Sequence, residues 1–384
     1  MKILILSAST GGGHNRTAAA LKKAITEKEP SAVVMIEDAL EYVSHAFNKL
    51  VVNGYFFFVK KAPHLYGIAY RMSDKKSPIS SLVNTATEFF GKRLITLIDG
   101  FKPDVIVATH PFTANMAACA KKKYSFYIPI ISIVTDYAPH RAYINDKIDK
   151  YIVSSEEMIN SMENVYDIPP ERILSLGIPI DNKFYNSVDR RTELEKIGFD
   201  PDKTTALFMA GSFGVTEVLK IYENIAALEN DFQVIIITGN NEKLYNKFTK
   251  LIENHPTDKK THLLKFTDEV EKYMQMADVI ITKPGGLTVT ESLATGLPMI
   301  VFKAYPGQEE DNTDYLIKKG SAVQIKKPKY APSVFLSLLE DPEKLSDMKK
   351  SSLSISCEHS ADKIYQLIKN LTENKNNTGS SAEN

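Results

Sequence analysis

The chain opens with KILILSASTGGGHN, residues 2–15, an apolar run that leads directly into three glycines and a histidine. Ile3 to Leu6 form a continuous apolar run, which is typical of a strand covered on both faces. The glycines after it allow positive φ and a close approach of the backbone to a ligand. A helix with Leu21, Ala24 and Ile25 on one face follows. Strand, glycine loop and helix in this order predict a doubly wound parallel α/β sheet.

Apolar runs of strand length recur along the chain in two series. A first series of apolar runs of strand length lies at residues 33–36, 104–109, 130–134, 151–154 and 173–179. Gly177 and Pro179 end that series, and a second one lies at residues 205–210, 234–238, 263–266, 279–282 and 299–302. The sequence therefore predicts two Rossmann-like domains that face a cleft, residues 1–180 and 181–355. A last helix is expected at residues 356–371, and the polar residues 372–384 are expected to be disordered.

Composition excludes several classes of protein. The 47 Lys and Arg residues balance the 47 Asp and Glu residues, so no overall field suggests nucleic acid as a partner. Cys119 and Cys357 lie far apart in the sequence, which argues against a disulfide framework or a structural zinc site. No apolar stretch is long enough to cross a bilayer, and the first residues do not form a signal peptide. We expect a cytoplasmic protein that meets a membrane only from its surface.

The first glycine loop carries a candidate base. In Gly11-Gly12-Gly13-His14-Asn15 the glycines precede a helix whose free N–H groups point toward the loop. His14 lies at the helix start, where an imidazole can accept a proton near neutral pH. We expect Gly11, Gly12, Gly13 and Asn15 to line the acceptor side of the cleft. Because Glu37 and Asp38 end the next strand and could bind a ribose, a dinucleotide-dependent dehydrogenase stays open at this point.

The second glycine loop is a candidate phosphate site. Lys283-Pro284-Gly285-Gly286-Leu287-Thr288 follows a predicted strand and opens a helix. Gly285 and Gly286 allow a phosphate to reach the helix N-terminus, and Thr288 can add a hydroxyl. Glu291 lies one turn further and can accept hydrogen bonds from a ribose diol.

Two further loops follow strands of the second domain. The loop after residues 299–302 is rich in hydrogen-bond acceptors and contains Gln308 and Glu309. The loop after residues 205–210 contains Gly211, Ser212 and Gly214, which suit a diphosphate or the floor of the cleft. Since ligands bind open α/β sheets beyond the carboxyl ends of the strands, both loops are candidate donor-binding segments.

With both glycine loops identified, the chain resembles the monogalactosyldiacylglycerol synthase and processive diacylglycerol β-glucosyltransferase group of glycosyltransferase family 28. The residues that carry the resemblance are Gly11 to His14, Lys283 to Gly286 with Glu291, Gly296 to Pro298, and Pro306 to Glu309. Val134 to Tyr137 and Gly177 to Pro179 match less specific segments. The resemblance covers about Met1 to Leu371.

The resemblance implies a GT-B fold whose last helix returns to the first domain. It also implies an inverting transfer of a hexose from UDP-glucose or UDP-galactose, held by the second domain. The acceptor implied is diacylglycerol or a glycosyl-diacylglycerol, held by the first. Glu291 carries over as the ribose contact, the glycine turn as the diphosphate contact, and Gln308 and Glu309 as sugar contacts.

The expected mechanism uses a side-chain base and no metal. His14 is the first candidate for the base and Asp136 the second. The helix N-terminus after Gly286 can stabilise the leaving diphosphate. No Asp-x-Asp motif stands in a loop after a strand, so we expect neither a divalent ion nor another cofactor.

Residues 41–98 form a long insertion in the first domain that contains a candidate membrane contact. Its apolar and basic residues are Tyr55, Phe56, Phe57, Phe58, Lys60 and Lys61. Apolar side chains beside lysines suit an anionic membrane surface, although the same residues could be ordinary core with a solvated basic face. Together with the implied lipid acceptor, they predict a peripheral protein at the inner face of the cell membrane.

Three alternatives stay open on the sequence. One is another GT-B enzyme, either a transferase that acts on a polyprenyl-linked acceptor or a UDP-sugar epimerase. Another is a non-catalytic UDP-sugar sensor that docks on membranes, and the third is the dehydrogenase. The sequence does not distinguish glucose from galactose, one added sugar from several, or a monomer from an oligomer.

Overall fold

The computed structural model describes most of the chain. The described residues are 1–9, 12–45, 49, 54, 62–74, 93–209, 216–255, 257–302 and 304–379. The chain divides into two compact units. The first comprises Met1–Asn182, Pro306–Gln308 and Cys357–Asn384, and the second comprises Lys183–Tyr305 and Glu309–Ser356. The division at Asn182 lies two residues after the predicted junction at Ile180.

The first unit is built on a parallel sheet with the strand order β2-β1-β3-β4-β5-β6. Its strands are β1 (Lys2–Ser7), β2 (Val33–Asp38), β3 (Val105–Ala108), β4 (Ile130–Ile133), β5 (Lys150–Ile152) and β6 (Ile173–Leu174). Its helices are α1 (Gly12–Lys28), α2 (Ala39–Val43), α4 (Pro63–Ser73), α6 (Pro111–Tyr124), α7 (Glu156–Tyr166) and α16 (Ser360–Gly379), with 3-10 turns η1 (Arg141–Tyr143), η2 (Pro170–Arg172) and η3 (Asn182–Tyr185).

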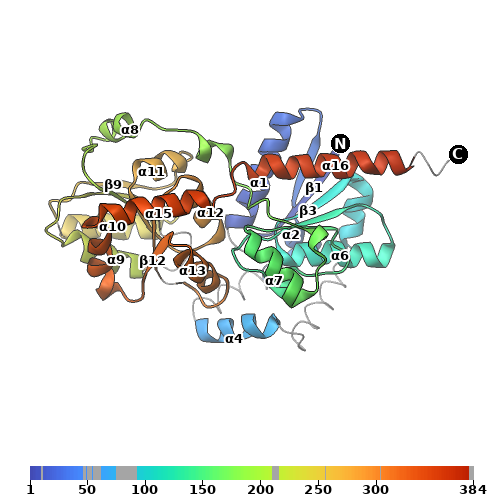
Figure 1. The fold of residues 1–384 in the computed structure, drawn as a ribbon, viewed down its shortest axis with the longest axis horizontal. Coiled ribbons are helices and arrows are strands. Elements are labelled where there is room, and N and C mark those ends of the chain that lie inside the picture. Colours follow the sequence, from blue (N-terminus) through green and yellow to red (C-terminus); the bar gives the residue numbers. More distant parts are fainter. Residues whose placement is uncertain are drawn as a thin grey trace. The chain divides into compact units, whose positions relative to one another are not determined.

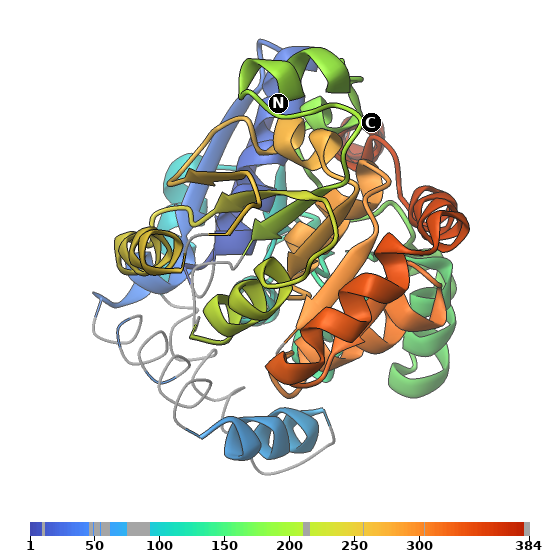
Figure 2. The same ribbon diagram turned by 90° about the vertical axis from the view of Figure 1, so that its left-hand side faces the viewer.

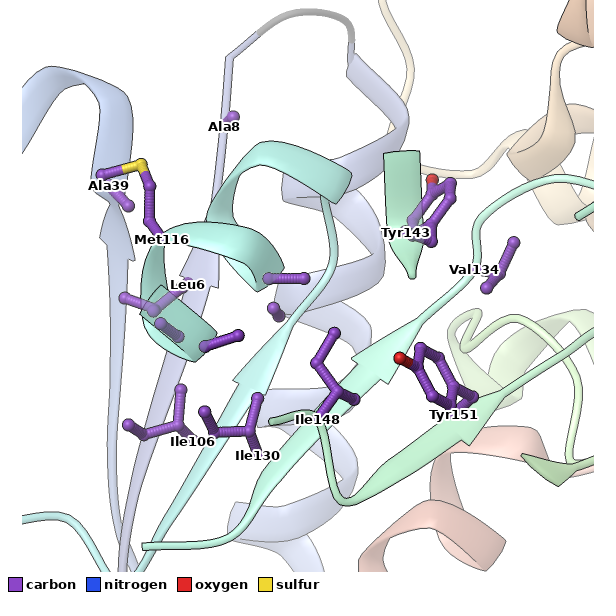
Figure 3. Packing of buried hydrophobic residues seen from close by; sticks show 14 of the residues in the cluster. Leu6, Ala8, Ala39, Ile106, Met116, Ile130, Val134, Tyr143, Ile148 and Tyr151 are labelled. Atoms are coloured by element: carbon purple, nitrogen blue, oxygen red, sulfur yellow. The ribbon is translucent and has the colours of Figure 1, made fainter. Parts of the chain in front are cut away.

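Both faces of this sheet are covered, as the continuous apolar strands predict. Leu4 and Leu6 of β1 point to one face, where they pack with Ile106, Ile130 and residues of α6. Figure 3 shows Leu6, Ile106 and Ile130 of neighbouring strands packed together, with Met116 of α6 against them. The alternate residues Ile3 and Ile5 point to the opposite face, which α1 and α16 cover.

The last helix belongs to the first unit. Ile364 and Ile368 of α16 are fully buried in the same cluster as Ile3 and Ile5, and α16 lies beside α1 (Figure 1). The implied return of the last helix to the first domain is therefore confirmed. Gly177 lies beside the start of this segment with φ +85°, and a side chain at Gly177 would clash with Cys357.

The second unit is a second parallel sheet, with the strand order β12-β11-β10-β7-β8-β9. Its strands are β7 (Thr205–Met209), β8 (Gln233–Ile237), β9 (Thr261–Leu264), β10 (Val279–Thr282), β11 (Met299–Phe302) and β12 (Ala322–Ile325). Its helices are α8 (Arg190–Lys196), α9 (Thr216–Ala226), α10 (Glu242–Asn254), α11 (Val270–Met276), α12 (Gly286–Ala294), α13 (Gln308–Lys318), α14 (Ala331–Leu339) and α15 (Pro342–Ser354), with the 3-10 turn η4 (Pro328–Tyr330). Figure 2 shows these strands with helices on both sides. The predicted fold of two doubly wound domains is confirmed.

Besides shifts of one or two residues at the ends of strands, the following details differ from the sequence prediction. β12 was not predicted; it is a short edge strand whose Val323 and Gln324 are only half-buried, so it lacks a continuous apolar run. β6 is confined to Ile173–Leu174. The disordered tail predicted from Thr372 is wrong for residues 372–379, because α16 continues to Gly379 and Thr372 is buried, with its hydroxyl 3.3 Å from the Met1 sulfur.

Candidate active site

The first half-site lies at the point where the strand order of the first sheet reverses. The chain goes from β1 to β2 on one side and then to β3 on the other side of β1. The connections after β1 and β3 therefore diverge, and they leave an open region at the carboxyl ends of these two strands. α1 begins after β1, and Thr109 and His110 follow β3. His14 and His110 thus lie at the carboxyl ends of the strands, where such sheets bind ligands.

His14 is the third residue of α1 and is half-buried. Its Nδ1 lies 2.7 Å from the carbonyl oxygen of Thr109. Because a carbonyl only accepts hydrogen bonds, Nδ1 carries the proton and Nε2 of the neutral ring has a free lone pair. Burial lowers the pKa of His14 to about 4, and the bond to Thr109 opposes this only in part. At neutral pH, His14 is therefore a neutral ring with its proton on Nδ1 and with Nε2 able to accept a second proton.

A second histidine, His110, lies against His14. The ring centroids are 4.6 Å apart and the planes are nearly perpendicular, at 78°. His110 caps α6, because its Nδ1 accepts a hydrogen bond from the N–H of Phe112 at 3.2 Å. Burial, together with the neighbouring His14, lowers the pKa of His110 well below the ordinary value. The sequence reading missed this residue, although a histidine directly after a strand next to β1 is the same signal that drew attention to His14.

The Thr135 hydroxyl connects His14 to Tyr143, whose pKa is affected by the charge of the second predicted base, Asp136. Thr135 Oγ1 lies 3.2 Å from His14 Nδ1 and 3.1 Å from the Tyr143 hydroxyl. Burial, and after it the charge of Asp136, raises the pKa of Tyr143, so this phenol stays protonated. The structure thus brings Asp136 into the same neighbourhood as His14.

Side chains before and after the first glycine turn bond to each other. Asn15 accepts a hydrogen bond from the Ser7 hydroxyl and donates one to the Ser9 hydroxyl. Gly12 is exposed and Gly13 half-buried, whereas Gly11 lies outside the described residues. Asp38, considered above for a ribose, accepts hydrogen bonds from the N–H groups of Ser9, Leu40 and Glu41. Its carboxylate therefore fixes the backbone around β2 and leaves less capacity for a nucleotide.

The second half-site lies at the matching point of the second sheet. Here the order reverses between β7 and β10, and the β10 connection is the glycine turn before α12. Gly285 is the N-cap and has no side chain to bond the first N–H groups of α12. The N–H groups of Gly286, Leu287 and Thr288 can bind an anion, as the first N–H groups of a helix commonly do. Gly211, Ser212 and Gly214, predicted in the loop after β7, lie outside the described residues.

Lys283 supplies a buried positive charge beside this turn. Its Nζ lies 3.2 Å from Glu309 Oε2 and 3.4 Å from the centroid of the Tyr305 ring. Glu309 Oε2 also accepts the N–H of Tyr305 at 2.8 Å. Burial, and after it the charge of Glu309, raises the pKa of Tyr305 to about 12. Lys283 is thus held in one place by a carboxylate and an aromatic face.

The remaining predicted donor residues belong to the helices that support the turn. Asn312 of α13 donates a hydrogen bond to the Pro284 carbonyl at 3.0 Å, which fixes the turn against α13. Glu291 of α12 is only 2 % exposed, and Thr288 is half-buried. Gln308 is the first residue of α13 and is also half-buried. Glu309, predicted as a sugar contact, uses its carboxylate on Lys283 and Tyr305.

No three His, Cys, Asp or Glu side chains among the described residues gather in a way that could hold a metal ion. Within the same residues, no helix has the length and apolar character needed to cross a membrane.

Comparison with known proteins finds a family model for each of the two units. Residues 14–180 match the family model of monogalactosyldiacylglycerol (MGDG) synthase, and residues 189–353 match that of the glycosyl transferases group 1. A processive diacylglycerol beta-glucosyltransferase from Bacillus pumilus is 29% identical over 370 residues, which is 96% of this chain and 94% of that protein. The resemblance stated from the sequence is thereby confirmed.

The protein is a glycosyltransferase with the GT-B fold. The solved structures that resemble it support this fold. MurG of Acinetobacter baumannii aligns with a TM-score of 0.66 at 15% identity, over 96% of this chain and 99% of MurG. S. aureus MnaA, in its co-structure with UDP, aligns with a TM-score of 0.60 at 14% identity, over 94% of each chain. The glycosyltransferase carries its glycine turns at the reversal points of both sheets, as described above.

Proposed function

We propose that this glycosyltransferase transfers a hexose from UDP-glucose or UDP-galactose to diacylglycerol or a glycosyl-diacylglycerol, with inversion at the anomeric carbon. The observation that carries the proposal is the state of His14, a neutral ring with Nδ1 bound to Thr109 and Nε2 able to accept a proton. A diacylglycerol acceptor is supported by the relative from Bacillus pumilus, whose name states that substrate.

On the acceptor side, the reaction removes one proton from an alcohol. The hydroxyl oxygen attacks the anomeric carbon and forms the new C–O bond, while His14 Nε2 takes the hydroxyl proton. The positive charge that develops on the ring is spread toward the Thr109 carbonyl through Nδ1–H. Attack from the face opposite the leaving group turns the α-linked sugar of the donor into a β-linked product.

On the donor side, the bond from the anomeric carbon to the UDP oxygen breaks, and UDP leaves with the electron pair. We assign the developing charge on the diphosphate to the N-terminus of α12 and to Lys283. Glu291 would bind the ribose, and Gln308 the hexose. Because the helix N-terminus and a buried lysine both stabilise an anion, the proposed reaction requires no divalent metal.

The test is product analysis. The purified full chain is incubated with diacylglycerol vesicles and UDP-glucose or UDP-galactose, with and without EDTA, and the lipids are examined by mass spectrometry and NMR. We expect a β-linked hexosyl-diacylglycerol, whose amount EDTA does not change. An α-linked product would overturn inversion, and loss of product with EDTA would overturn metal independence. Conversion of the UDP-sugar without any glycolipid would support an epimerase instead.

For the membrane contact, α4 offers an exposed apolar face. Leu65, Ile68 and Met72 are 59%, 55% and 46% exposed, and their spacing places them on one face of the helix. Arg71 is also exposed on α4, and Lys75 and Lys76 follow in the sequence. Large apolar side chains next to basic residues suit the surface of an anionic bilayer. We propose that α4 binds the membrane; the predicted contacts from Tyr55 to Lys61 lie outside the described residues.

The opposite side of α4 is attached to the first unit. His140 Nε2 donates to the Tyr70 carbonyl at 3.0 Å, and the two rings stack with centroids 4.2 Å apart. Asp74, just after the helix, accepts hydrogen bonds from the Arg141 N–H and the Tyr166 hydroxyl. These contacts hold α4 against the first unit, so that Leu65, Ile68 and Met72 remain on its exposed face.

Vesicle sedimentation tests the role of α4. The double variant Leu65→Ser, Ile68→Ser should bind vesicles that contain phosphatidylglycerol more weakly than the unchanged protein. Val165→Ser is the matched control, because Val165 of α7 is equally exposed, at 58%. Equal binding by the double variant and the control would overturn the assignment of α4. Equal binding to neutral and anionic vesicles at low salt would overturn the contribution of the basic residues.

A further inference from the structure

His110 has one ring nitrogen that its structural role does not use. Its Nδ1 accepts the Phe112 N–H, so Nδ1 has no proton and the neutral ring carries its proton on Nε2. No described residue accepts a hydrogen bond from that Nε2–H. The side chain is only 6% exposed, but Nε2 is not one of the fully buried polar atoms that lack a partner among the described residues. Capping therefore uses one of the two ring nitrogens and leaves Nε2–H as a donor for a ligand.

His14 and His110 have opposite tautomers. The His14 proton is on Nδ1, which leaves Nε2 as an acceptor, whereas the His110 proton is on Nε2, which leaves that atom as a donor. The two rings are in direct contact, 4.6 Å between centroids. Both residues follow the strands between which the sheet order reverses. The first half-site thus places one hydrogen-bond acceptor and one donor side by side.

This pairing fits the chemistry of the acceptors proposed above. In a glyceride alcohol, the reacting hydroxyl is next to a carbon that carries an ester oxygen. In a glycosyl acceptor, the carbon next to the reacting hydroxyl group carries a second hydroxyl or the ring oxygen. Each therefore offers a proton and, close to it, an oxygen that can accept a hydrogen bond.

We propose that His110 is an acceptor-binding residue, whose Nε2–H donates a hydrogen bond to the oxygen neighbouring the hydroxyl that His14 deprotonates. The proposal rests on the proposed function. In this proposal, His110 aligns the acceptor alcohol and His14 removes the proton of the reacting hydroxyl. A second hydrogen bond restricts rotation of the alcohol, so its loss raises KM for the acceptor and leaves the affinity for UDP unchanged.

Two substitutions separate binding from capping. An Asn side chain can reproduce the Nδ1 acceptor and keep the cap of α6, whereas a Gln side chain can extend an N–H donor to the position of Nε2. His110→Asn should therefore keep the melting temperature but raise KM for a short-chain diacylglycerol by about 10-fold. His110→Gln should lower the melting temperature but keep KM closer to that of the unchanged enzyme. UDP affinity should be the same in both.

Asn241 calibrates the cost of losing such a cap, because its Oδ1 accepts the Leu244 N–H at the start of α10 at 3.1 Å. Asn241→Gln should lower the melting temperature as His110→Gln does and leave KM for the acceptor unchanged. Equal acceptor KM values for His110→Asn and His110→Gln, or a lower KM for the Asn variant, would overturn the proposal. If the unchanged enzyme forms no glycolipid, the proposed function fails, which is a different result from either.

Discussion

The two glycine turns of this enzyme have the same construction and different contents. Each follows a strand at the reversal point of a parallel sheet and opens a helix, α1 in the first unit and α12 in the second. The first turn carries a half-buried ring that is neutral and can accept a proton, His14. Beside the second turn lies a buried ammonium group, Lys283, fixed by Glu309 and Tyr305. The comparison indicates that side chains next to the turn decide the chemistry, which we infer to be proton transfer in one half and anion binding in the other.

The largest effect is expected in the first half. His14→Ala removes the proposed base, so turnover should fall about 100- to 10,000-fold, the usual contribution of a general base. Steady-state assays of glycolipid formation measure this directly. Circular dichroism should give a spectrum equal to that of the unchanged protein, because the turn is also held by Asn15. Near-normal turnover would remove His14 from the chemistry.

The second half should respond less strongly. Lys283→Gln removes the positive charge beside the α12 turn, and turnover should fall about 100-fold, the typical cost of losing one charge-stabilising group. Lys329→Gln is the matched control, because Lys329 also lies over a tyrosine ring, Tyr330 at 5.0 Å, but is exposed and remote in sequence from the turn. The control should keep its turnover. A Lys283→Gln enzyme as active as the control would contradict the assignment.

Acid should destabilise the first unit more than the second. Burial lowers the pKa of His14 to about 4 and also lowers those of His110 and His140. Unfolded histidines bind a proton below about pH 6.5, so the unfolded state takes up more protons than the folded state between pH 6.5 and about 4. The free energy of unfolding therefore falls as the pH decreases through this window.

Hydrogen exchange resolves that effect by unit. After correction for the intrinsic rates, amides of β1 and β3 should lose more protection between pH 7 and pH 5 than amides of β7 and β10. The second unit contains one histidine with a lowered pKa, the half-buried His262. An equal loss in the two sheets would show that the buried histidines do not control acid stability.

The smallest expected effects concern the glycines that support each half. Gly296, after α12, has φ +64°, and a methyl group there would lie 2.9 Å from the Leu353 side chain. Gly296→Ala should lower the free energy of unfolding by about 1–2 kcal/mol, the cost of a left-handed conformation for a non-glycine residue. Gly177→Ala in the first unit should cost more, because Cys357 and Ser360 crowd that position. Urea unfolding measures the free energy of unfolding of both variants. A smaller loss for Gly177→Ala than for Gly296→Ala would contradict the close packing at Gly177.

The sequence predicted the strands and glycine turns of both units better than the side-chain contacts around the turns. β10 and β11 have the predicted bounds because their apolar runs are continuous, and His14 was found because the glycines mark its turn. β12 was missed because it is an edge strand, which is less covered by neighbours and therefore lacks a continuous run of apolar residues. His110 was missed because its importance arises from two strands, β1 and β3, that are adjacent only in the folded sheet. The pairing of Glu309 with Lys283 likewise depends on the fold, since 26 positions separate them in the chain.

The division of labour between the two turns is tested most directly by titrating UDP into His14→Ala and Lys283→Gln by calorimetry. The account predicts that His14→Ala binds UDP as tightly as the unchanged enzyme, whereas Lys283→Gln binds it more weakly. A loss of UDP affinity in His14→Ala with normal affinity in Lys283→Gln would contradict it.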